Sequence, residues 1–170
     1  MLIENFNFSI PNMAGGDKLT RSLVDSIVEG IEKSKFDDIP KQTDVVRSFR
    51  EAGWGEKVAV GKELNHTIDG ILEGVGLCVY FGHSGAAFQK IMAMQSIFMS
   101  GRLSECYFVT QSLDTASLRN ITVNPRAKPG VTGNRITFEE INKAMDRYHR
   151  FITVPMTLVG IEISESQLRE

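Results

Sequence analysis

The first half of the chain places apolar residues with a helical period. Apolar side chains at positions 19, 23, 24, 27, 28 and 31 have the spacing of a helix with one buried face, and Asp17 is placed to cap its start. Residues 37–40 break this pattern, and a second, more polar helix is predicted over 43–51. Both helices precede a short hairpin.

The hairpin is the most informative stretch of the chain. Residues 67–72 and 75–81 are predicted to form two strands joined by a tight turn at Glu73 and Gly74. The second strand is an uninterrupted apolar run, which is typical of a central strand covered on both faces. We therefore expect it to lie in the middle of a sheet.

A helix and a strand are predicted after the hairpin. Ser84 is a candidate N-cap for a helix over 85–100, with apolar side chains along one side. Residues 105–111 are expected to form a third strand. The stretch 112–136 shows no clear period and is predicted to be the only long loop.

The last elements are a helix and a strand. Thr137 and Glu140 have the spacing of a capping box, which opens a long helix, and residues 154–163 are expected to form a closing strand. This order predicts an α/β fold with a mixed central β-sheet flanked by helices on both faces. At 170 residues we expect a single domain over 1–170, with a helical part at about 17–52 and a sheet core at about 57–163.

Composition and charge narrow the classes of protein. Hydrophobic residues make up 42% and charged residues 24%, which argues against a disordered, collagen-like or disulfide-rich chain. The net charge of −2 is unlike that of a histone-like DNA binder, so any nucleic-acid role must depend on a local patch. Cys78 and Cys106 lie in apolar runs typical of buried thiols, so we expect a cytoplasmic protein. No stretch approaches the roughly 18 apolar residues of a membrane span, and we expect no membrane partner.

Candidate chemistry centres on the hairpin. Asp69 lies on its first strand, and Cys78 and Tyr80 share one face of the second because side chains two residues apart point the same way. These residues are candidates for an active site. The structural alternatives are a turn residue for Asp69 and core residues for the other two. A Cys78 nucleophile assisted by His66 or His83 is a further alternative.

A second candidate site is basic. Residues 115–138 contain four cations and no Asp or Glu. Such a segment can bind phosphates and offer Arg and Asn side chains to base edges, although a solvated loop has the same composition. A helix start at 83–85 also favours an anion. The candidate DNA-binding residues are Arg119, Asn124, Arg126, Lys128, Asn134, Arg135, His83 and Ser84.

Together these features resemble the BglII-like type II restriction endonucleases, a branch of the PD-(D/E)XK nuclease superfamily, over about residues 43–163. The resemblance depends on Trp54, on Asp69 followed after eight residues by the strand 78–82, and on the sequence from Phe138 to Ile161. It implies a restriction-endonuclease-like fold, a magnesium cofactor and a homodimer. It also implies double-stranded DNA as partner, with a GATC-centred palindrome as the target.

The chain departs from the family pattern at two positions. In the family an Asp is followed, after eight residues, by Glu-x-Gln; Asp69 matches, but Cys78 and Tyr80 occupy the other two ligand positions. A thiol is a soft ligand poorly matched to magnesium, and a phenol supplies no amide near an attacking water. The candidates to complete the ligand set are Glu73 in the hairpin turn, Glu56 or Glu63 upstream, and Lys90 and Gln95 from the following helix.

Three hypotheses remain open at this point. The first is a DNA-binding protein with a degenerate metal-dependent phosphodiesterase site. The second is an active magnesium-dependent, site-specific endonuclease with an unusual ligand set that includes Asp69. The third is an interaction domain that reuses the fold without binding nucleic acid.

Overall fold

The computed structural model describes residues 18–33, 38–61 and 66–168. The helices in chain order are α1 (Lys18–Lys33), α2 (Gln42–Glu51), α3 (Ser84–Met99), α4 (Leu113–Val123), α5 (Phe138–Tyr148) and the short 3-10 helix η1 (Glu165–Gln167). The strands are β1 (Val58–Ala59), β2 (Thr67–Ile68), β3 (Gly70–Leu72), β4 (Val75–Val79), β5 (Glu105–Gln111) and β6 (Met156–Ile161).

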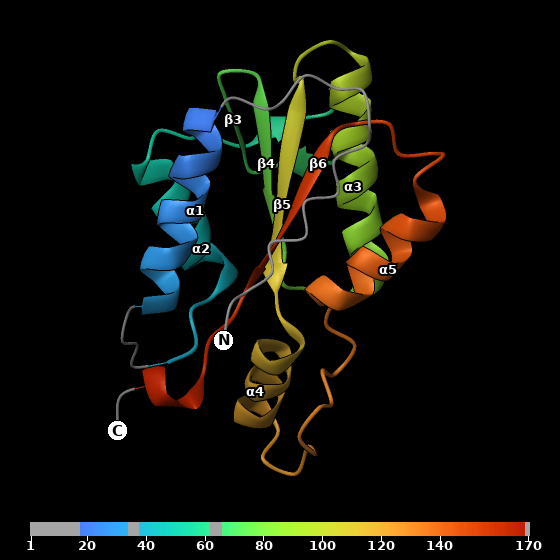
Figure 1. Cartoon of the computed structure of the whole chain (residues 1–170). Helices are drawn as coiled ribbons and strands as arrows, with labels where there is room; N and C mark the ends of the chain where they lie inside the picture. Colours follow the sequence, from blue (N-terminus) through green and yellow to red (C-terminus); the bar gives the residue numbers. More distant parts are fainter. Residues whose placement is uncertain (1–17, 34–37, 62–65, 169–170) are drawn as a thin grey trace.

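The centre of the fold is a four-stranded mixed sheet in the order β3-β4-β5-β6. Strand β3 is antiparallel to β4, whereas β4, β5 and β6 are parallel to one another. Helices α1 and α2 cover one face of the sheet, α3 and α5 cover the other, and α4 lies beyond the end of β5 (Figure 1). The predicted mixed sheet with helices on both faces is confirmed.

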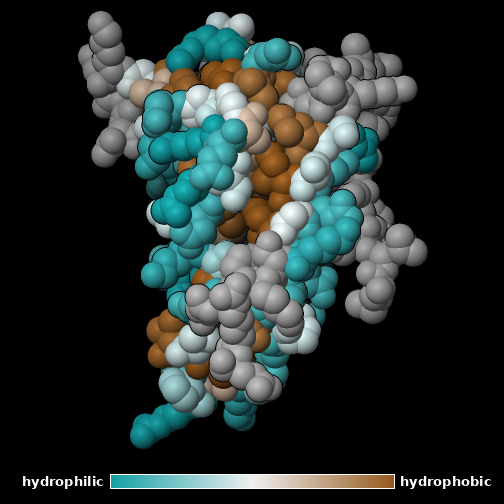
Figure 2. Space-filling view, turned by 90° about the vertical axis from the view of Figure 1, so that its left-hand side faces the viewer, coloured by the Kyte–Doolittle hydropathy of each residue, from teal (hydrophilic) through white to brown (hydrophobic). Residues whose placement is uncertain are grey.

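Strand β4 is buried on both sides, as its continuous apolar sequence predicts. Leu77 and Val79 pack in the cluster beneath α1 and α2, with Phe49 and Trp54, while Cys78 packs in the cluster beneath α3 and α5. On the face of the molecule that carries α1 and α2, a band of apolar residues is exposed between two bands of polar residues (Figure 2).

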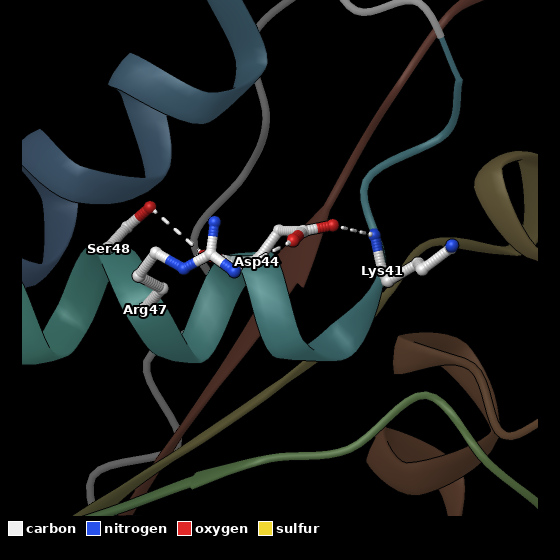
Figure 3. A network of polar contacts seen from close by, with 4 residues as sticks. All are labelled: Lys41, Asp44, Arg47 and Ser48. Atoms are coloured by element: carbon white, nitrogen blue, oxygen red, sulfur yellow. Dashed lines mark hydrogen bonds and ion pairs between the residues drawn. The ribbon is translucent and has the colours of Figure 1, made fainter.

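The start of α2 is fixed by a local network of polar contacts (Figure 3). The Asp44 carboxylate accepts a hydrogen bond from the backbone N–H of Lys41 at 2.9 Å, and the Asp44 carbonyl accepts one from the Ser48 hydroxyl. Arg47 lies 3.9 Å from the same carboxylate. Because an acid in the first turn satisfies a free amide and complements the helix dipole, α2 begins at Gln42, one residue before its predicted start.

The first hairpin strand differs from its predicted form. The structure breaks 67–72 at Asp69, so that β2 pairs with β1 and β3 pairs with β4. The turn at Glu73 and Gly74 is as predicted, with positive φ at both residues (49° and 82°), which is the backbone conformation of a type I′ hairpin turn.

The prediction of one long loop over 112–136 is wrong, because its first half is α4. The Ser112 hydroxyl caps this helix by accepting a hydrogen bond from the backbone N–H of Thr115, and Ala116 is fully buried. Buried small residues gave too weak an apolar stripe to reveal the helix. The loop proper covers 124–136.

Two predicted helix starts need correction, and one lies outside the described residues. His83, not Ser84, is the N-cap of α3. Thr137 caps α5 by accepting a hydrogen bond from the backbone N–H of Glu140, but the Glu140 carboxylate accepts a bond from the Ser84 hydroxyl, outside its own helix. The predicted cap Asp17 falls outside the part of the chain that the structure describes.

Candidate functional site

Asp69 lies where the chain passes from one sheet to the other. Its backbone N–H donates to the Leu77 carbonyl at 2.8 Å, and its carboxylate accepts a hydrogen bond from the backbone N–H of Val79, also at 2.8 Å. Strand β3 pairs with β4 only from Gly70 onward, so the carboxylate takes the place of a strand partner for the Val79 amide. The side chain is only 6% exposed.

The surroundings of Asp69 act on its pKa in opposite directions. Burial raises the pKa of this carboxyl above its ordinary value of 3.8, and the hydrogen bond from Val79 opposes the rise. Three cations, Lys90, Lys57 and Arg50, also lower it. The environment of this carboxylate is therefore apolar on the inside and basic around it.

Cys78 shares the buried face of the hairpin with Asp69. Burial raises the pKa of its thiol, and the neighbouring Asp69 carboxylate raises it further through its charge and its hydrogen bond with the thiol. A nucleophilic cysteine needs an exposed, lowered-pKa thiol. The Cys78 nucleophile is therefore contradicted by its complete burial, and Cys78 is a core residue.

Tyr80 is held beside its own strand. It packs against the same cluster as Cys78, which agrees with the predicted shared face. A Cβ atom built on Gly82 would lie 2.4 Å from the Tyr80 hydroxyl oxygen, so the phenol folds back over that glycine. Its carbonyl accepts a hydrogen bond from the Thr110 hydroxyl at 2.8 Å, which ties the end of β4 to β5.

The other candidate ligands lie apart from a common centre. Glu56 is exposed and forms an ion pair with Arg50 at 3.2 Å, and Glu73 is exposed in the hairpin turn at the opposite end of β3. Gln95 is buried and bonded to the backbone N–H groups of Thr153 and Val154. Lys90 does approach the site, because its ammonium donates to the Thr67 carbonyl at 2.8 Å. The candidate Glu63 lies outside the part of the chain that the structure describes.

The residues at this site do not fit magnesium. Hard divalent cations take several oxygen ligands, whereas the family positions here carry one carboxylate, one thiol and one phenol. Across the described residues, no three His, Cys, Asp or Glu side chains come together as a metal-binding group. Three nearby cations oppose a further positive charge.

Arg119 faces the protein interior from α4. Its guanidinium donates to the Gln111 side chain at 3.1 Å and to the Pro40 carbonyl at 2.7 Å, and it lies 5.4 Å from the centre of the Phe81 ring. Burial lowers the pKa of this arginine, and the charge of Arg135 lowers it further. Arg119 thus joins α4 to the end of the sheet.

The structure brings four of the predicted DNA-binding residues together at the carboxyl end of β4. His83 and Arg135 form an antiparallel bridge, and the backbone N–H of Ser84 donates to the Asn134 carbonyl. Next to them, the Gln111 amide donates to the carbonyl of Ile136, which fixes this segment to the end of β5.

The remaining predicted DNA-binding residues lie in the exposed loop that follows α4. Arg126 and Lys128 are exposed, and the Asn124 side chain accepts a hydrogen bond from the backbone N–H of Arg126. The loop is anchored to α4 because the Ser117 hydroxyl accepts a bond from the Gly130 N–H at 2.7 Å. Its two cations are thus presented to solvent on a supported backbone.

Sequence reasoning missed three residues around these sites. Lys57 and Arg50 were not connected with Asp69, because the pairing of the two-residue strand β1 depends on tertiary contacts. Gln111 is fully buried and bridges Arg119 to the end of the sheet. The sequence did contain a signal for the role of Gln111: it is a polar residue at the end of an apolar strand, and a buried polar group there needs hydrogen-bond partners.

Comparison with solved structures defines the class of fold. The chain matches the crystal structure of restriction endonuclease BglII complexed with a DNA 16-mer with a TM-score of 0.66 and 9% sequence identity. The match covers 88% of this chain and 71% of that one. The fold is therefore that of a restriction endonuclease.

Sequence comparison defines the family. The family model described as restriction endonuclease BglII/BglIII matches residues 17–161. The chain belongs to this BglII-like restriction endonuclease family, and the match begins upstream of the region over which the resemblance was expected. No individual curated protein matches it in sequence. None of the helices described is long and apolar enough to cross a membrane.

Proposed function

We propose that this protein binds double-stranded DNA and has lost the metal-dependent phosphodiesterase activity of its family. The observation that carries the proposal is the state of the three family ligand positions. Only Asp69 retains a carboxylate, which is buried against Val79; Cys78 is enclosed as a thiol and Tyr80 is folded over Gly82. Recognition without cleavage is the activity that such a site supports.

The basic segment supports the DNA-binding part of the proposal. His83 and Arg135 lie together at the end of β4, and Arg126 and Lys128 are exposed on the adjoining loop. Cations release counterions when they contact phosphates, so binding by this surface should weaken as salt rises. The proposed target is a GATC-centred palindrome.

The test is a mobility-shift titration of a GATC-centred duplex and a scrambled duplex. We expect Arg126→Ala and Arg135→Ala to bind the GATC-centred duplex more weakly than the wild-type protein does. Lys33→Ala, at the end of α1, should bind it with the wild-type affinity. Equal affinity of all four proteins would contradict the proposed surface. Failure of the wild type to bind either duplex at low salt would favour the interaction-domain hypothesis.

A homodimer is part of this proposal, because a palindromic site matches a two-fold protein. Its proposed surface is an apolar stripe formed by α3 and the turn just after α5, where Met92, Met99 and Phe151 are 53%, 76% and 74% exposed. Phe88 of α3 and Tyr148 of α5 join the two helices through an edge-to-face contact, with their ring centroids 6.0 Å apart. Large exposed apolar groups of this kind mark interaction surfaces.

Charge around the stripe favours a second copy as its partner. The exposed residues of α3 carry no charge, while the exposed side of α5 carries both signs, at Lys143, Asp146 and Arg147. A rim with both signs can pair with itself across a two-fold axis. Sedimentation velocity should detect a dimer that Met92→Lys dissociates and Val131→Lys, on the far loop, does not; a monomeric wild type would contradict this surface.

A further inference from the structure

The basic loop that follows α4 contains two consecutive tight turns, 128–131 and 132–135, and side chains of α4 hold both of them. We propose that Asn120, together with Ser117, is a positioning residue that fixes the two turns relative to each other and thereby sets which base pairs the loop recognises. This inference rests on the proposed DNA-binding function and adds to it the source of sequence discrimination.

The first turn presents Lys128 to solvent. The backbone N–H of Val131 donates to the Lys128 carbonyl at 3.2 Å, and Gly130 has a φ of 81°. A proline at the second position and a glycine with positive φ at the third are typical of a type II turn, and Pro129 and Gly130 occupy these positions. The exposed Lys128 stands at the first position, so its direction depends on where this turn is held.

The second turn leads into Arg135. The backbone N–H of Arg135 donates to the Thr132 carbonyl at 3.3 Å. Both central residues, Gly133 and Asn134, have positive φ (62° and 64°), which is the conformation of a type I′ turn. The bridge between Arg135 and His83 then fixes the chain at the start of α3. Arg135 is therefore placed by the end of the sheet.

Two side chains on one face of α4 hold the two turns together. The Ser117 hydroxyl accepts a hydrogen bond from the Gly130 N–H at 2.7 Å, and the Asn120 amide donates to the Val131 carbonyl at 2.9 Å. A Cβ atom on Gly133 would lie 2.6 Å from the Asn120 side-chain oxygen, so Asn120 also packs against the second turn. Ser117 and Asn120 share a helix face because they are three residues apart. Asn120 thus joins the first turn to the second.

Helix α4 is a firm support for the two turns. The Thr115 hydroxyl donates to the Ile161 carbonyl at 3.1 Å and accepts from the Ile163 N–H at 2.7 Å, which ties the helix to the end of β6. Arg119 ties the same helix to the Pro40 carbonyl at 2.7 Å. The turns are therefore positioned against the sheet through α4 as well as through their own chain.

A fixed loop shape matters more for reading bases than for attracting phosphates. Attraction to phosphates depends on the number of cations, and neither Ser117 nor Asn120 is charged. Reading a base edge requires the contacting side chain to be held in a defined geometry, and one such contact discriminates against a wrong base by about tenfold or more. Loosening the two turns should therefore reduce sequence discrimination and leave non-specific binding unchanged.

The experiment compares two duplexes by fluorescence anisotropy: one that the wild-type protein selects from a random pool, and a scrambled version of it. The measured quantity is the ratio of the two affinities. We expect Asn120→Ala to reduce this ratio by about tenfold or more, with wild-type affinity and salt dependence for the scrambled duplex. Thr122→Ala, on the same helix, should keep the wild-type ratio. Loss of stability alone would lower both affinities together and keep the ratio, which would contradict the positioning role.

Gly133→Ala tests the contact with the second turn. Its added methyl collides with the Asn120 oxygen, so this variant should also reduce the ratio. In the Asn120→Ala background that oxygen is absent, so Gly133→Ala should reduce the ratio less there than in the wild type. Additive effects of the two substitutions would overturn the assignment of Asn120 to both turns.

Gly101→Ala is the matched control for backbone strain. Gly101 also has a positive φ, of 74°, but an added methyl there meets no atom within 4 Å among the described residues. It should keep the wild-type ratio. Thermal melting checks that each variant is folded, and Gly133→Ala carries the test if Asn120→Ala is not.

The outcomes separate this inference from the function on which it rests. An unchanged ratio for Asn120→Ala and Gly133→Ala would overturn the positioning role and leave the proposed function standing. A wild-type protein that binds all duplexes equally would also overturn the positioning role, while DNA binding would stand. No wild-type binding at low salt would overturn the proposed function and this inference together.

Discussion

The Asp69 carboxylate accepts the backbone N–H of Val79 at 2.8 Å, across the point where the hairpin strand changes sheets. This contact gives the acid a structural role that needs no metal. Removing the acceptor leaves a buried amide unpaired, which costs about 1–3 kcal/mol. We predict that Asp69→Ala is less stable than Asp69→Asn by this amount in urea unfolding. Equal stability of the two variants would contradict the structural role.

The pH dependence of stability should carry the signature of two carboxyls whose folded-state pKa is raised. Burial raises the pKa of Asp69 above 3.8 and that of Glu32 above 4.5. At pH values between the unfolded-state and the folded-state pKa of these carboxyls, the folded protein binds more protons than the unfolded protein. Their contribution to stability is therefore highest below this pH window and falls as the pH rises through it. The stability advantage of Asp69→Asn over the wild type should therefore grow as the pH rises from about 4. A constant difference in the free energy of unfolding would argue against the raised pKa of Asp69.

Arg119 and Arg126 should separate stability from DNA binding. Arg119 makes two hydrogen bonds and a contact with Phe81, so Arg119→Ala is expected to cost about 2 kcal/mol or more. Arg126 is exposed, and Arg126→Ala should change stability by less than about 0.5 kcal/mol. Chemical denaturation measures both. A stable Arg119→Ala protein would show that the guanidinium does not join α4 to the sheet.

Gln95 should behave as a core residue and not as a ligand. Its oxygen accepts from the backbone N–H groups of Thr153 and Val154, and its amide donates to the Thr153 hydroxyl. Gln95→Leu leaves these groups unpaired and should cost about 2–4 kcal/mol. The neighbouring exposed Ser96→Ala serves as the control in the same thermal melts. Unfolding of both variants at the wild-type temperature would refute the assignment.

The sequence predicted most of the fold because its elements carry strong local signals. The unbroken apolar run of β4 and the Glu73-Gly74 turn are visible without tertiary information. Helix α4 was missed because Thr115, Ala116 and Ser117 bury a face with little apolar character.

The candidate site was less predictable because it depends on partners distant in sequence. Asp69 was expected on the strand beside Cys78; it does lie beside Cys78, but at the break between β2 and β3. That Asp69 would bond to Val79, with Lys57 across a two-residue ladder, follows only from the break in the first strand. Likewise, the inward turn of Arg119 depends on Pro40, 79 residues away.

We propose DNA recognition without metal-dependent cleavage, and duplex binding by the wild-type protein in EDTA and in magnesium tests this proposal most directly. We predict salt-dependent binding in EDTA, the same affinity after magnesium is added at equal ionic strength, and intact strands recovered from the complex. Binding that begins only with magnesium, or strand cleavage that Asp69→Ala abolishes, would contradict the account.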